Sequence, residues 1–73
     1  MSVELSKEEK IQIINSHQRN LAYSKYNLEI DVLQENAKTA PSATAVTSLQ
    51  SLITEVSSQL SALDAELAAV SAE

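Results

Sequence analysis

The sequence predicts an all-α fold: an antiparallel two-helix hairpin of the coiled-coil type that oligomerises into a helical bundle. First, the 73 residues include no glycine and a single proline, which favours helix over strand. Second, the apolar residues between Val46 and Val70 are spaced alternately three and four apart, as in a helix that lays one seam against another helix. Third, Pro41 divides the chain into two halves of similar length. Two helices of equal length, joined by a short connection, pack most readily as antiparallel neighbours.

The first helix is expected to begin at a capping box formed by Ser6, Lys7, Glu8 and Glu9. In this motif the serine hydroxyl accepts the backbone N–H of the glutamate three residues on, and the glutamate carboxylate accepts the N–H of the serine. Helical spacing of apolar residues then continues as far as residue 37.

The break between the helices lies at Pro41, which would remove a hydrogen bond and clash with the preceding turn inside a continuous helix. Lys38 is placed to complement the end of the first helix, and Ser42 or Thr44 can cap the second. The prediction is one domain over 1–73, with a helix at about 7–37, a loop at about 38–42 and a helix at about 43–73. The alternative is one long kinked rod in a parallel oligomer.

Two sets of apolar residues follow from helical periodicity. The seam between the two helices is predicted to contain Ile11, Ile14, Leu21, Leu28, Val32, Val46, Leu49, Ile53, Val56, Leu60, Leu63, Leu67 and Val70. A second stripe on the first helix, about 120° or more from its seam at 100° per residue, is a candidate oligomer or partner face and contains Ala22, Tyr26, Ile30, Leu33 and Ala37. A narrow polar strip is expected to separate the two stripes and contains Gln18, Lys25, Glu29 and Asn36.

Two apolar stripes on one helix require two neighbours, because one partner helix cannot cover both. We therefore expect the hairpin to associate with itself, as a dimer of hairpins first and a trimer second, or with another helical protein. The mixture of β-branched residues and leucine along the seam of the second helix does not select one oligomer state.

Charge is distributed unequally between the two helices. Residues 41–73 contain four acidic side chains and no lysine or arginine, so the first helix must supply the cations. If the chain folds back near residue 40, His17 and Arg19 are expected near Asp64, and Lys7 or Lys10 near Glu73. Such exposed pairs contribute about 0 to 1 kcal/mol each, so they select orientation more than they stabilise.

The composition argues against several classes of function. With one histidine, no cysteine and no glycine, the chain lacks the usual catalytic, metal-binding and phosphate-binding patterns, so we expect no enzyme, no cofactor and no metal. A net charge of -5 argues against nucleic acid as a partner. No segment approaches the length and hydrophobicity of a membrane span or a signal peptide, so we expect no membrane partner and a soluble, cytoplasmic protein.

The stretch EEKIQIINSHQRNLAYSKYNLEIDVLQENA, followed by a helix rich in serine, threonine and alanine, resembles short helical proteins encoded by marine bacteriophages of the T4-like cyanophage type. The resemblance implies a small accessory or structural phage protein in the host cell, with no assigned activity and no functional residues to carry over. We expect a non-enzymatic structural or assembly protein that acts through helix–helix self-association. The alternative is a regulatory module that docks a helix of another protein.

Overall fold

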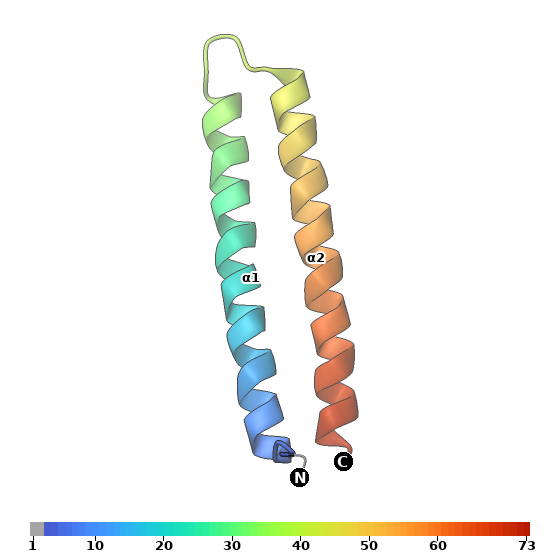
Figure 1. Cartoon of the computed structure of the whole chain (residues 1–73). Coiled ribbons are helices and arrows are strands. Elements are labelled where there is room, and N and C mark those ends of the chain that lie inside the picture. Colours follow the sequence, from blue (N-terminus) through green and yellow to red (C-terminus); the bar gives the residue numbers. More distant parts are fainter. Residues whose placement is uncertain (1–2) are drawn as a thin grey trace.

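Two long helices lie side by side and antiparallel in a computed structural model of the chain, which describes residues 3–73 (Figure 1). Helix α1 spans Lys7–Asn36 and helix α2 spans Ala43–Ser71. Both termini lie at one end of the hairpin and the connecting loop lies at the other. The predicted all-helical hairpin is therefore confirmed, and the single kinked rod is excluded. The helices end one and two residues earlier than predicted, at Asn36 and Ser71.

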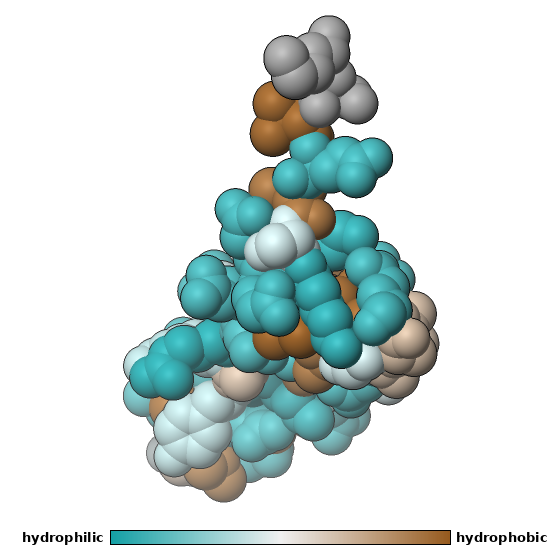
Figure 2. All heavy atoms as spheres, turned by 90° about the horizontal axis from the view of Figure 1, so that it is seen from below, coloured by the Kyte–Doolittle hydropathy of each residue, from teal (hydrophilic) through white to brown (hydrophobic). Residues whose placement is uncertain are grey.

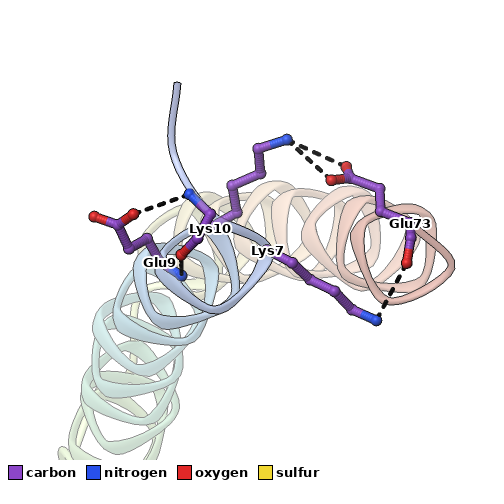
Figure 3. Close-up of polar contacts among 5 residues, drawn as sticks. Lys7, Glu9, Lys10 and Glu73 are labelled. Carbon is purple, nitrogen blue, oxygen red and sulfur yellow. Dashed lines mark hydrogen bonds and ion pairs between the residues drawn. The ribbon is translucent and has the colours of Figure 1, made fainter. Parts of the chain in front are cut away.

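The capping box at the start of α1 is present with both of its hydrogen bonds (Figure 3). The Glu9 N–H donates to Ser6 Oγ at 3.1 Å, and the Ser6 N–H donates to Glu9 Oε1 at 2.9 Å. The hydrogen bond from the Ser6 backbone N–H to the Glu9 carboxylate, with a smaller contribution from the Ser6 side chain, holds the pKa of Glu9 below its ordinary value. The ionised carboxylate thus satisfies an otherwise unpaired N–H at the positive end of the helix dipole.

The thirteen residues predicted for the seam between α1 and α2 are each buried or partly buried. Among residues 3–73 only Ile14 and Val70 are buried, with 7% and 4% of their surface exposed, and both lie toward the end of the hairpin opposite the loop. Figure 2 views the hairpin from that end and shows apolar side chains between hydrophilic ones. The hairpin therefore has a continuous but shallow core.

The predicted polar strip on α1 is corrected by the structure at two positions. Gln18 and Lys25 are partly buried and alternate with Ile14, Leu21 and Leu28 at spacings of three and four, so they belong to the seam. The apolar residues alone leave Gln18 and Lys25 between the two stripes, whereas the heptad repeat of the seam continues through polar residues. Gln18 Nε2 donates to Asp64 Oδ1 on α2 at 2.7 Å, which gives this seam position a polar partner.

The loop is held by the carboxylate of Glu35, in the last turn of α1. This carboxylate accepts a hydrogen bond from the backbone N–H of Ser42 at 3.0 Å, and it forms an ion pair with Lys38, whose Nζ lies 3.0 Å from Glu35 Oε1. Ser42 is the N-cap of α2, because its Oγ accepts the N–H of Ala45 at 3.1 Å. Since Ala45 stands where a capping box would have glutamate, Glu35 supplies that carboxylate from the other helix. Lys38 thus binds a carboxylate rather than complementing the end of α1 alone.

At the open end of the hairpin, two lysines of α1 meet Glu73 (Figure 3). Lys10 Nζ lies 3.1 Å from Glu73 Oε1 and 3.3 Å from Oε2, and Lys7 Nζ donates to the main-chain oxygen of Glu73 at 3.4 Å. The predicted proximity of Lys7 or Lys10 to Glu73 is therefore confirmed for both lysines.

Within one hairpin, neither His17 nor Arg19 is the partner of Asp64. Asp64 accepts its hydrogen bond from Gln18, and neither His17 nor Arg19 forms an ion pair within residues 3–73. His17 and Arg19 flank Gln18 in the sequence, so they lie at about the same height along the hairpin as Asp64. They point to other sides of α1, because adjacent residues of a helix point about 100° apart.

The neighbouring isoleucines Ile13 and Ile14 provide a test of the seam with a matched control. Ile13 is 47% exposed, whereas Ile14 is buried. We expect Ile14→Ala to lower the free energy of unfolding by about 2 to 3 kcal/mol and Ile13→Ala by less than about 1 kcal/mol, because only Ile14 leaves a cavity. Urea unfolding followed by circular dichroism measures both changes. Equal losses at the two positions would contradict the assigned seam.

Glu35 predicts a pH dependence of stability. Its pKa is held below the ordinary value of 4.5, first by the Ser42 N–H and then by Lys38. The folded chain thus binds fewer protons at this group than the unfolded chain, so the stabilisation is present above pH 4.5 and is lost as the pH falls through the lowered pKa. We expect Glu35→Gln to lower the Tm by a few degrees at pH 7 and to lose much of this difference at pH 3.

The control for this measurement is Glu29→Gln, a change at an exposed position of the same helix. It removes the same charge without touching the loop. A Tm difference for Glu35→Gln that did not depend on pH would show that the ionised carboxylate does not hold the loop.

Candidate self-association surface

The largest exposed side chains of the hairpin lie on the outside of α1. Tyr26 and Leu33 are each 64% exposed, and Tyr23 is 61% exposed. Tyr23 and Tyr26 are separated by three residues and Tyr26 and Leu33 by seven, so they cover neighbouring turns of one surface. Apolar side chains that gather into one exposed patch, unlike single ones, mark a surface where a partner binds.

The predicted candidate face corresponds to this surface. Ala22, Tyr26, Leu33 and Ala37 are exposed, and Ile30 is partly buried although it lies away from the seam. The structure thus places all five residues on the part of α1 that α2 does not cover. We call this set, together with Arg19 and Tyr23, the outer face of α1.

Arg19 and Tyr23 were not predicted as part of this face. The Arg19 guanidinium carbon lies 5.7 Å from the centroid of the Tyr23 ring, which is within range of a cation–π contact. Arg19, Ala22, Tyr23 and Tyr26 line a shallow open groove. The spacing of four between Arg19 and Tyr23 is the signal in the sequence that could have identified the contact.

This groove combines a flat aromatic surface with a cation that has no ion-pair partner within residues 3–73. Tyrosine and arginine are the residue types that most often dominate the energy of protein interfaces. A guanidinium fixed over an aromatic ring is also oriented for two hydrogen bonds to one carboxylate. The groove is therefore suited to an acidic side chain presented by another helix.

A second shallow groove lies where the two helices meet, on the other side of the hairpin. It is lined by His17, Asn20, Leu21, Gln59, Ala62 and Leu63. His17 is exposed there, and its neighbours in the groove are amide and apolar side chains with no carboxylate among them.

Two further features of the described residues bear on function. No three histidine, aspartate or glutamate side chains of residues 3–73 are grouped so that they could hold a metal ion. Neither α1 nor α2 is apolar enough over a sufficient length to span a membrane.

Comparison of the chain with protein-family models, with curated proteins and with solved structures finds no match. The resemblance to bacteriophage proteins therefore stays a prediction.

Proposed function

We propose that this chain is a non-enzymatic structural or assembly protein that works by association of its hairpins into a helical bundle. The observation that carries the proposal is the outer face of α1, where Tyr23, Tyr26 and Leu33 are all more than half exposed. Burying one such side chain is worth about 1.5 to 3 kcal/mol, so a partner that covers them gains a substantial free energy. A second copy of the chain is always present to do so.

The dimensions of the hairpin support the same proposal. Its extents are 60 × 21 × 15 Å and its radius of gyration is 17.0 Å, whereas a compact domain of this length has about 11 Å. Its accessible surface is 5425 Å², whereas a folded monomer of this mass exposes about 4,400 Å². The excess is about 1,000 Å² per chain, or about 2,000 Å² in a dimer, which is the size of a stable interface.

The small core points in the same direction. Within residues 3–73 only two side chains, Ile14 and Val70, are exposed by less than a tenth, and the chain has no cysteine to form a disulfide. Chains of this length generally need such a reinforcement or oligomerisation to be stable. Association of hairpins supplies the missing burial.

The alternative is a regulatory module whose outer face of α1 docks a helix of another protein. The groove of Arg19, Tyr23 and Tyr26 favours it, because tyrosine and arginine are common anchors of interfaces between different proteins. We favour self-association since the chain carries both the apolar face and an acidic helix that could cover it. The resemblance to bacteriophage proteins supports an accessory or structural role, in the cytoplasm of a host cell.

Sedimentation equilibrium tests the proposal on the chain and on the double variant Tyr26→Ser/Leu33→Ser. We expect a defined dimer for the unaltered chain and a Kd raised at least about 100-fold for the variant, because two large apolar side chains leave the interface. Ile13→Ser is the matched control, since Ile13 is an exposed apolar residue of α1 outside the outer face.

Two results would count against self-association through the outer face of α1. A chain that stays monomeric over the whole concentration range would overturn it. A dimer that is unaffected by the double variant, which instead loses a bound helical protein, would favour the regulatory module.

A further inference from the structure

We infer that the surface covering the outer face of α1 is helix α2 of a second copy, with both hairpin loops at the same end and Arg19 of one chain beside Asp64 of the other. This arrangement rests on the self-association proposed above and specifies its geometry. Each chain then contributes α1 to one new contact and α2 to the other, so the dimer is a four-helix bundle with a two-fold axis along its length.

The hydrogen bond from Gln18 to Asp64 marks the side of the hairpin that would face the second copy. On α1, Ala22 and Tyr26 follow Gln18 at steps of four residues, so they flank this side. On α2, the residues that share a side with Asp64 precede it at steps of three, four and three; they are Ser61, Ser57 and Thr54. The same side of the hairpin thus has large residues on α1 and small ones on α2.

Large and small side chains on facing helices can interdigitate. Thr54 is prepared for such a contact, because its hydroxyl donates to the Gln50 main-chain oxygen at 3.1 Å and leaves its methyl group for an apolar neighbour. Ser57 and Ser61 lose little conformational entropy when they are covered. The rings of a second chain can therefore approach α2 closely at these positions.

The register of the hairpin places the complementary groups at one level. Gln18 is level with Asp64, and Lys10 is level with Glu73. When the loops of two hairpins lie at the same end, α1 of one chain and α2 of the other keep this register. Arg19 then lies level with Asp64, Ala22 with Ser61, and Tyr26 with Ser57 of the second copy.

Charge complementarity favours this arrangement. Four lysine and arginine residues of α1 lie in its first twenty residues, and three of the four acidic residues in 43–73 lie at the same end of the hairpin. Arg19 has no ion-pair partner among the described residues, and Gln18 takes only Oδ1 of Asp64, which leaves Oδ2 for a second donor. A carboxylate bound by an amide on one side and a guanidinium on the other has both oxygens satisfied.

A back-to-back dimer, in which two α1 helices face each other, fits the surface less well. It forms a single helix–helix contact per dimer, whereas the side-by-side bundle forms two. The accessible surface of the chain exceeds that of a compact monomer by about 1,000 Å², and two helix–helix contacts cover this excess better than one. The back-to-back dimer also leaves the small residues of α2 without a partner.

Cross-linking between chains that carry one introduced cysteine each tests the geometry, since the natural sequence has none. We expect a mixture of Ala22→Cys and Ser61→Cys chains to form the mixed disulfide dimer under mild oxidation at least about fivefold more than Ala22→Cys mixed with Glu66→Cys, because only the first pair comes within disulfide range. Glu66 is the matched control: it is exposed and lies seven residues from Gln59, which lines the groove on the other side of the hairpin.

The outcomes separate this inference from the function on which it rests. If the chain is dimeric but Ala22→Cys cross-links best to itself or to Glu66→Cys, the side-by-side geometry is overturned and self-association stands. If the chain is monomeric by sedimentation, both are overturned.

A charge exchange provides a second measurement that needs no cysteine. We expect Arg19→Asp to raise the dimer Kd about three- to tenfold, and the double variant Arg19→Asp/Asp64→Arg to recover part of this loss, because the exchanged charges meet again across the interface. If the double variant had a higher dimer Kd than Arg19→Asp and Asp64→Arg measured singly, the assigned pair would be overturned.

Discussion

A hairpin of two helices has a single seam, and this constraint governs the rest of the structure. Each helix can turn only one stripe toward its neighbour, so every other face meets water unless a further partner covers it. The seam runs the full length of both helices, yet among residues 3–73 only Ile14 and Val70 are removed from solvent almost completely. Secondary structure, orientation and loop are well specified, while the burial that stabilises a domain is left incomplete.

The antiparallel orientation of the two helices is specified by side chains of α1. α2 contains no lysine or arginine and has no acidic residue in its first turn, so it cannot complement either end of its own dipole. α1 supplies both groups: Glu35 places a carboxylate at the start of α2, and Lys7 and Lys10 place cations at its end. A parallel arrangement would lose all three contacts. Although each is individually weak because it is exposed, together they distinguish antiparallel from parallel pairing.

The sequence predicted the two helices and the break between them because local signals mark where each begins and ends, and it predicted the apolar seam because its spacing repeats along each helix. The capping box, Pro41 and the spacing of three and four each have one structural meaning. Features carried by single polar residues were missed. Gln18 and Lys25 lie in the seam because the heptad repeat continues through them, and Glu35 binds Ser42 because the loop brings two distant residues together. The pairing of Arg19 with Tyr23 depends on side-chain conformation, which spacing alone does not determine.

The polar residues of the seam connect folding to association. Gln18 and Lys25 occupy positions where leucine or isoleucine would pack better, so the isolated hairpin gives up burial that a fully apolar seam would have. Polar residues at such positions fix the register and the pairing of helices at a cost in stability. A hairpin weakened in this way is stabilised by mass action whenever its outer face binds a partner, since binding removes folded chain from the unfolding equilibrium. The polar residues that make the pairing of α1 and α2 specific thus also leave the stability of the hairpin open to an increase by any partner that binds only the folded chain.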